Sequence, residues 1–325
     1  GPVRKVKRRS VEEIIMAKMK PDALSELPYS EDSPFGVCHL GASAKHFNNL
    51  GLSWCRMGLP ELSAAEAEKW AKKDTFPFHD GARELIDEGG HVLGLLNYKN
   101  KGAAKGKQWM ADEDRSYLSV VETCTTKLVE AHADEVKYWE LINEPEIFFK
   151  AADPDDAAAI AKTTAKAARR ADPNAVILSP TTTSLLYMEE MLQHGVGDVV
   201  DIFAIHLYDY GAGLTQGVER WKNLFEEYGY GNKPIWMSET GYRSDAKHGE
   251  PDEIRRHWHE RLDKQAKVVV TSHVRLRAEG IEKVMWYAYT DVRNVHAKEN
   301  YGLVWSAGGI RDRGKRAGWP RRAKW

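Results

Sequence analysis

Tyr138-Trp139-Glu140-Leu141-Ile142-Asn143-Glu144-Pro145 is the segment from which the fold assignment starts. Its apolar residues are typical of a strand covered on both faces, and Pro145 has no N–H for a sheet ladder, so the strand is expected to end there. Period-two alternation predicts that Glu140, Ile142 and Glu144 lie on one side of the strand. Glu144 is therefore expected to point into the mouth of a barrel.

Around this segment, short β-rich runs alternate with longer helical patterns, which is typical of a parallel sheet. The helical periodicity is found in Asp114–His132, Asp155–Arg170 and Asp252–Glu279. Eight candidate strands can be identified: Phe35–Leu40, Gly51–Met57, His91–Leu96, Val136–Ile142, Ala175–Ser179, Val200–Leu207, Pro234–Ser238 and Lys283–Tyr289. Eight β/α units without an internal linker favour an α/β fold of the (β/α)8 TIM barrel type, in a single domain, over a doubly wound sheet.

The barrel is expected to span residues 35–305. Residues 1–34 are expected to form an N-terminal tail and a helix at Val11–Lys20 that packs on the barrel floor. Residues 306–325 are expected to form a basic C-terminal tail or an irregular last helix, because the chain becomes rich in glycine after Tyr289. The basic runs Arg4–Arg9 and Arg311–Lys324 are typical of solvated tails.

The composition excludes several kinds of partner. The formal net charge of the 325 residues is −1, so no global field attracts nucleic acid or an anionic membrane. No apolar run reaches the roughly 18 residues that a membrane span needs. We therefore expect neither nucleic acid nor membrane as a partner.

The three cysteines, Cys38, Cys55 and Cys124, are too few and too scattered to predict a disulfide framework. Cys38 and Cys55 fall in apolar runs, so we expect buried free thiols, which favours a reducing compartment. The localisation stays open between the cytoplasm and secretion. Gly1-Pro2 resembles the remnant of a protease cleavage, and a signal peptide could have been removed before it.

Two glutamates directly follow apolar runs. One is Glu144, and the other is Glu239 in Pro234-Ile235-Trp236-Met237-Ser238-Glu239-Thr240-Gly241. Working residues of such barrels lie at the carboxyl ends of the strands. A glycosidic bond is cleaved by one protonated carboxyl and one ionised carboxylate, so this pair fits that chemistry; ion pairs at the barrel rim are the structural alternative.

The two carboxyls need different environments for this reaction. Arg56, His206 and Tyr208 also come at strand ends and can donate hydrogen bonds that would hold Glu239 anionic. Burial and the neighbouring negative charge are expected to favour the protonated form of Glu144.

The Asn143-Glu144-Pro145 motif, with Glu239 at the seventh strand end, resembles clan A of the glycoside hydrolases, and most of all its short members related to families 39 and 5. The resemblance covers Phe35 to Val304. It implies a retaining hydrolase that needs no cofactor. The implied roles are acid/base for Glu144, nucleophile for Glu239, sugar 2-hydroxyl binding for Asn143, bracing of the nucleophile for Arg56, a position near the acid/base for His206, a hydrogen bond to the nucleophile for Tyr208 and the floor of the −1 sugar site for Trp286.

Two segments depart from the family pattern. The third strand ends in Leu96-Asn97-Tyr98, where many relatives have histidine or tryptophan, and the segment after Gly302-Leu303 lacks the usual Lys-Pro-Ala helix start. Asn97 is kept as a sugar-binding candidate. His39, at the first strand end, could reach a sugar hydroxyl or could be a core histidine bonded to the backbone.

The segment Tyr98 to Trp109 is rich in lysine. A solvated loop is the ordinary interpretation. The alternative is that Lys99, Lys105 and Lys107 attract an acidic glycan while Trp109 stacks on a sugar. Carbohydrate, possibly acidic in the second case, is thus the expected partner.

Three other functions stay open beside the retaining hydrolase: a transglycosylase, a catalytically idle barrel that binds glycans, and a metal-dependent hydrolase. The last needs converging His and Asp side chains at strand ends, and His39, His206 and Asp291 are the residues near such positions. His257 and His259 would point to different faces of a helix, so no metal site is predicted.

Overall fold

The structure is a computed structural model that describes residues 29–40, 47, 50–58, 78, 80–97, 115, 117–148, 153–244, 258–289 and 301–303. The expected helix Val11–Lys20, both basic runs, the lysine-rich segment with Trp109 and the expected last helix lie outside these ranges. No helix in the described part of the chain is long and apolar enough to cross a membrane.

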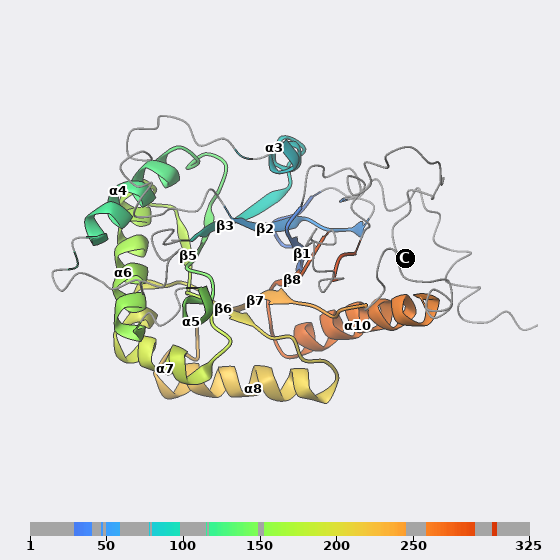
Figure 1. Cartoon of the computed structure of the whole chain (residues 1–325). Coiled ribbons are helices and arrows are strands. Elements are labelled where there is room, and N and C mark those ends of the chain that lie inside the picture. Colours follow the sequence, from blue (N-terminus) through green and yellow to red (C-terminus); the bar gives the residue numbers. More distant parts are fainter. Residues whose placement is uncertain are drawn as a thin grey trace, which may run out of the picture.

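Eight parallel strands form one sheet in the order β5-β4-β3-β2-β1-β8-β7-β6. They lie at the centre of the molecule (Figure 1). All eight expected strands are found; β3 has the expected bounds, and the bounds of the others differ by a few residues: β1 Phe35–Cys38, β2 Trp54–Gly58, β3 His91–Leu96, β4 Tyr138–Leu141, β5 Val176–Leu178, β6 Phe203–His206, β7 Ile235–Thr240 and β8 Val284–Trp286.

The two ends of this strand order meet, which closes the sheet. Leu178 of β5 and Ile202, just before β6, form a parallel bridge. The Ser179 amide donates to the Ile202 carbonyl at 2.9 Å, and the Asp201 amide donates to the Ile177 carbonyl at 2.8 Å. The bridge connects the two edge strands of the described sheet, and the predicted (β/α)8 barrel is confirmed.

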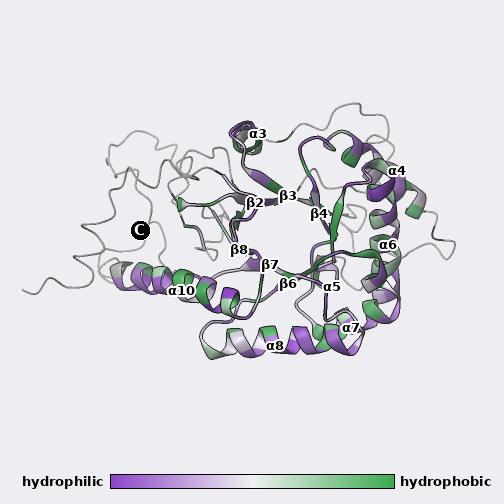
Figure 2. Ribbon diagram, turned by 180° about the vertical axis from the view of Figure 1, so that it is seen from behind, coloured by the Kyte–Doolittle hydropathy of each residue, from purple (hydrophilic) through white to green (hydrophobic). Residues whose placement is uncertain are grey.

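Helices surround the strands on the outside (Figures 1 and 2), and their turns mix apolar and polar residues as expected for helices with one face on a sheet. The described helices are α3 Asp80–Asp87, α4 Tyr117–Glu130, α5 Pro145–Phe148, α6 Pro154–Ala171, α7 Leu185–Gln193, the 3₁₀ helix η4 Val196–Val199, α8 Ala212–Glu227 and α10 Trp258–Ala278. In α6, Asp153 accepts a hydrogen bond from the Asp155 amide and Pro154 takes the first helical position, both strong start signals.

The apolar side chains divide into an outer and an inner cluster. The outer cluster lies between the strands and the helices and includes Cys55, Trp139 and Trp286. The inner cluster fills the barrel: Cys38, Trp54, Leu93, Leu178, Ile202, Ala204, Trp236 and Met285. Cys38 and Cys55 are buried and form no disulfide, as expected, and Cys124 is buried as well. The filled lumen leaves the carboxyl ends of the strands as the place for a site.

Candidate active site

The alternation along β4 breaks just before Glu144. Glu140 points into the barrel, where it contacts Arg56, but Ile142 belongs to the outer cluster. The expectation that Glu140, Ile142 and Glu144 share one side is therefore wrong for Ile142. The reason is local: Asn143 forms an isolated bridge with Thr181, and Glu144 has a left-handed backbone with φ 41°.

A second break in the alternation, in β7, points the Glu239 side chain into the barrel. Trp236 of β7 already faces inward, so strict alternation would place Glu239 outside. The register between β6 and β7 shifts: Ile205 pairs with Met237, but His206 pairs with Glu239, so Ser238 is an extra residue. Such a bulge re-aims the side chain that follows it.

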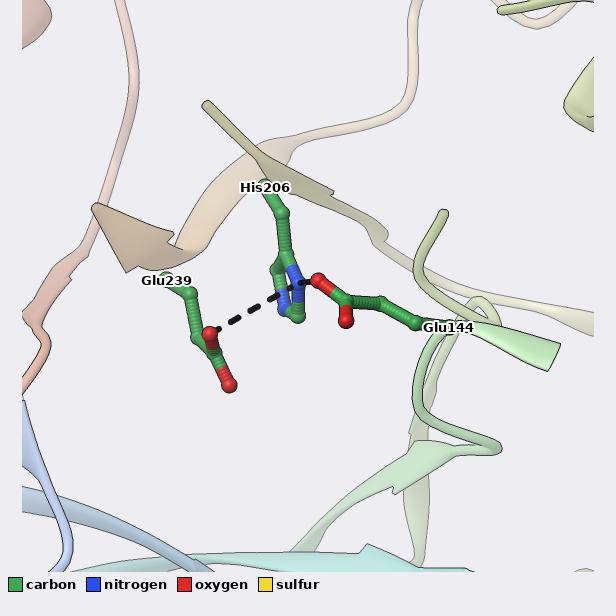
Figure 3. Close-up of side chains that lie close together, drawn as sticks. All are labelled: Glu144, His206 and Glu239. Atoms are coloured by element: carbon green, nitrogen blue, oxygen red, sulfur yellow. Dashed lines mark hydrogen bonds and ion pairs between the residues drawn. The ribbon is translucent and has the colours of Figure 1, made fainter. Parts of the chain in front are cut away.

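Glu144 and Glu239 face each other with His206 between them (Figure 3). His206 Nδ1 lies 2.7 Å from Glu144 Oε1 and 3.9 Å from Glu239 Oε2. One ligand atom from each of the three side chains lies within 4.8 Å of the other two, so an oxygen of Glu144 and an oxygen of Glu239 are no more than 4.8 Å apart. The carboxylate side chains are 12% and 10% exposed, whereas the imidazole is fully buried.

Glu239 is held in its ionised form. Arg56 Nη1 donates to its Oε1 at 2.5 Å, and the Tyr208 hydroxyl donates to its Oε2 at 2.6 Å. Burial alone would raise the pKa of Glu239, but His206, Arg56, the Tyr208 hydrogen bond and His39 together lower it below its ordinary value. Glu239 is thus suited to act as an anion.

Arg56 connects several strands beneath the site. Its guanidinium is 3% exposed and binds Glu140 through Nε at 2.9 and 3.0 Å and through Nη2 at 2.5 Å. Nη2 also donates to Asn143 Oδ1 at 2.7 Å. Burial would lower the pKa of Arg56, but the charges of Glu140 and Glu239 raise it, so the group stays cationic.

Two of the remaining candidates, Asn97 and His39, lie nearby on different strand ends. Asn97 Oδ1 accepts from the Asn143 amide at 3.4 Å, so it touches the residue expected to bind the sugar. His39 is exposed, and its ring meets the Tyr287 ring edge-on at 5.2 Å. Trp109 lies outside the described residues.

The expectation that Trp286 forms the floor of the −1 sugar site is wrong. The Trp286 side chain is buried in the outer cluster, where it stacks on His273 of α10 with ring centroids 6.0 Å apart, and its Nε1 donates to the Tyr301 carbonyl. It therefore faces the helices and not the barrel interior. The next residue, Tyr287, packs against the inner cluster and contacts the Tyr208 ring, because successive side chains of a strand point to opposite faces.

Sequence reasoning missed two further side chains. The first is Glu140, which stands within an apolar strand sequence. A carboxylate buried there needs a cationic partner, so its position could have indicated a buried ion pair. Glu146 Oε1 accepts from the Thr182 hydroxyl and the Thr183 amide, both at 2.6 Å, so it fixes the loop after β5 beside Glu144. No pattern in the sequence pointed to Glu146.

One group of side chains in the described part of the chain is close enough to hold a metal ion, and it consists of Glu144, His206 and Glu239. The geometry fits a hydrogen-bonded pair better than a cation site. Glu144 and His206 already bond each other at 2.7 Å, and Arg56 places a positive charge 2.5 Å from Glu239. A divalent cation would have to displace both contacts.

A family model described as glycosyl hydrolase catalytic core matches residues 98–315. No curated protein sequence matches the chain. A family 39 glycoside hydrolase from the gut symbiont Bacteroides cellulosilyticus WH2 is similar in structure, with TM-score 0.61 and 18% identity over 84% of this chain and 60% of that one. A monomeric β-xylosidase from Caulobacter crescentus CB15 gives TM-score 0.59 and 15% identity over 86% of this chain and 66% of that one.

A third similar structure is the β-glucuronidase 2 of Bacteroides uniformis covalently bound to cyclophellitol-6-carboxylate aziridine. It gives TM-score 0.57 and 15% identity over 83% of this chain and 33% of that one. These similarities show a shared barrel fold. The chain spans less than two thirds of the length of each of these three proteins.

Proposed function

The chain belongs to the glycosyl hydrolase catalytic core family, and we propose that it is a retaining glycoside hydrolase that cleaves a β-type bond in an oligo- or polysaccharide. One observation carries the proposal. Two carboxylates from different strand ends lie with oxygens no more than 4.8 Å apart, and one of them is held anionic by Arg56 and Tyr208.

The separation favours retention over inversion. Carboxyl groups lie about 5–5.5 Å apart in retaining enzymes and about 6.5–9.5 Å apart in inverting ones, which must fit a water molecule between carboxylate and sugar. An oxygen-to-oxygen distance of no more than 4.8 Å between Glu144 and Glu239 supports the retaining class.

In the first step, Glu239 attacks the anomeric carbon and the bond to the leaving oxygen breaks. Glu144 transfers its proton to that oxygen. In the second step, Glu144 takes a proton from water, the water oxygen attacks the anomeric carbon, and the ester bond to Glu239 breaks. The cationic Arg56 and the Tyr208 hydroxyl keep Glu239 deprotonated between turnovers.

The experiment that tests this proposal is trapping of the covalent intermediate. The protein is incubated with activated 2-fluoro glycosides of several sugars and digested, and the labelled peptide is sequenced by mass spectrometry. The expected label is on Glu239, and Glu239→Gln is the matched control that should take none. A label on another residue, or turnover with inverted product, would contradict the role of Glu239.

Other outcomes separate the alternatives. An idle glycan-binding barrel would bind oligosaccharides without turning over any nitrophenyl glycoside. A transglycosylase would pass the sugar to an added acceptor faster than to water. Activity that survives exhaustive EDTA treatment would dispose of the metal-dependent hydrolase.

An acidic glycan is the finer substrate proposal. It rests on Lys99, Lys105 and Lys107, which lie outside the described residues. Replacing all three by Ala should weaken cleavage of a uronate-bearing or sulfated substrate and reduce its salt sensitivity, because exposed charges are screened by salt. Cleavage that is equally fast and equally salt-insensitive before and after the change would contradict it.

A further inference from the structure

Glu140 is a fully buried carboxylate that takes no part in the chemistry proposed above. It lies in the middle of β4, where its side chain is 0% exposed and surrounded by apolar strand residues. Burying a carboxylate is costly unless a cation and hydrogen bonds compensate it. Arg56 supplies both, through three contacts of 2.5 to 3.0 Å.

The contacts divide the guanidinium between two carboxylates. Nε and Nη2 face Glu140, while Nη1 faces Glu239 at 2.5 Å. Guanidinium is planar, and its donors form a rigid fork. The hydrogen bonds from Nε and Nη2 to Glu140 therefore fix the plane of the guanidinium. In this plane Nη1 points at Glu239.

The charges divide in the same way. One cation, Arg56, neutralises two buried anions, so Glu239 receives part of its charge. A carboxylate paired with a whole cation holds its electrons more tightly and is a poorer nucleophile, whereas one with too little support becomes protonated.

We infer that Glu140 is a positioning residue that shares Arg56 with Glu239 and so leaves Glu239 anionic but incompletely neutralised. The inference rests on the proposed role of Glu239 as nucleophile. Glu140 acts on Glu239 through Arg56, and it touches neither the sugar nor the reacting atoms.

Other titratable groups also lie around Glu239. They come from β1, β4, β6 and β8 and their carboxyl ends: Cys38, His39, Glu144, His206, Tyr208 and Tyr287. A change at Glu140 leaves all of them in place. A shift in the titration of Glu239 in a Glu140 variant therefore reports on the loss of the Glu140 charge and on the arginine that the two carboxylates share.

The test is Glu140→Gln, which keeps the shape and one acceptor oxygen but removes the charge. The pH dependence of kcat/KM is measured, since its acidic limb reports ionisation of the nucleophile in the free enzyme. Arg56 would then act on Glu239 alone, so the acidic limb should move down by about one pH unit and kcat should fall about tenfold.

The sign of the shift decides between this inference and a purely structural role. If Glu140 only braced the barrel, its loss would free Arg56 from Glu239, and the acidic limb would move up or stay in place; either result would overturn the inference. Glu140→Asp is the matched control, because it keeps the charge, and its acidic limb should stay at the wild-type pH even if kcat/KM falls. If the Gln variant does not fold, an upward shift in the Asp variant overturns the inference and an unmoved limb supports it.

Failure of the proposed function would look different. If the fluoro glycoside does not label Glu239 of the wild-type protein, the proposed function fails, whatever the Glu140 variants show. If Glu239 is labelled in wild type and in Glu140→Gln, and the acidic limb of the variant has not moved down, only the inference about Glu140 fails.

Discussion

The Tyr208 hydroxyl lies 2.6 Å from Glu239 Oε2 and donates its proton to that oxygen. Burial, the charge of Glu239 and this hydrogen bond raise the pKa of Tyr208 well above its usual range, so the phenol remains a donor at any working pH. A hydrogen bond to the ionised form of a carboxyl lowers its pKa. Tyr208 thus helps to keep Glu239 ionised.

Tyr208→Phe removes that donor and keeps the ring. The pKa of Glu239 should rise, so the acidic limb of kcat/KM should move up by about one pH unit, while activity at higher pH falls about tenfold. The pH profile measured with one aryl glycoside checks this. Tyr228→Phe is the control, because Tyr228 bonds Glu189 on the outside of the barrel, and its profile should match wild type. An unmoved limb in Tyr208→Phe would show that the hydrogen bond does not set the ionisation.

His206→Ala should lower kcat/KM about a hundredfold or more. The imidazole is fully buried 2.7 Å from Glu144, so its removal leaves the carboxyl group without the partner that orients it. Leaving groups of different acidity provide the measurement: the loss should be largest for a poor leaving group, which needs protonation. His194→Ala is the control, since His194 is partly exposed and pairs with Asp155 at the surface. Equal losses of kcat/KM for all leaving groups would show that His206 does not act on protonation of the leaving group.

Azide distinguishes the proposed roles of the two glutamates. Glu239→Ala and Glu144→Ala should each lose several orders of magnitude in turnover, and azide should restore part of it. In Glu239→Ala azide replaces the nucleophile, so the glycosyl azide should have inverted configuration. In Glu144→Ala, with an activated leaving group, azide attacks the glycosyl-enzyme, so the product should be retained. The same stereochemistry from both variants, read by NMR, would contradict the assignment.

The sequence predicted the barrel well because strand runs are local. His91–Leu96 is found with the expected bounds, and both glutamates lie at strand ends as expected. Eight β/α units predict a closed barrel. In the structure β1 pairs with β8, and a bridge connects β5 to the residue before β6.

The direction of single side chains was harder to predict, because it depends on register. Glu239 faces the barrel only because Ser238 is an extra residue against β6, and no local pattern shows a bulge. Trp286 and Tyr287 are adjacent aromatic residues, and the pairing of Val37 with Trp286 decides which one faces the helices. Such pairings join strands far apart in the chain, so the local sequence did not show that Trp286 faces the helices.

Arg56→Met should be strongly destabilising. It leaves Glu140 as a buried carboxylate without its cation, and breaking a buried pair costs about 3–5 kcal/mol. Unfolding by urea, followed by tryptophan fluorescence, measures the change in free energy. Arg83→Met is the matched control: Arg83 pairs with Glu135 at the surface, where the pair contributes at most about 1 kcal/mol. Similar losses in the two variants would show that the buried pair does not stabilise the barrel beyond an ordinary surface contact.

Gly241→Ala should damage the surroundings of Glu239 without changing a carboxylate. A Cβ at Gly241 would lie 2.5 Å from the Tyr287 carbonyl oxygen, 3.0 Å from the Tyr301 ring and 3.3 Å from the Tyr208 ring. Backbone atoms cannot rotate away, so the end of β7 or the segment after β8 must move, at a cost of about 1–3 kcal/mol in stability. Because Tyr208 lies in the same contact, its hydrogen bond to Glu239 should lengthen.

The expected result is therefore a loss of about tenfold in kcat/KM together with an acidic limb displaced upward, in the same direction as in Tyr208→Phe. Gly213→Ala supplies the comparison, because its Cβ would meet Asp209 at an ordinary 3.6 Å in the first turn of α8, where alanine favours the helix. Its activity should match wild type. If Gly241→Ala lost stability but kept the wild-type pH profile, the tyrosine contacts would matter for folding alone, and Tyr208 would be held at Glu239 by other means.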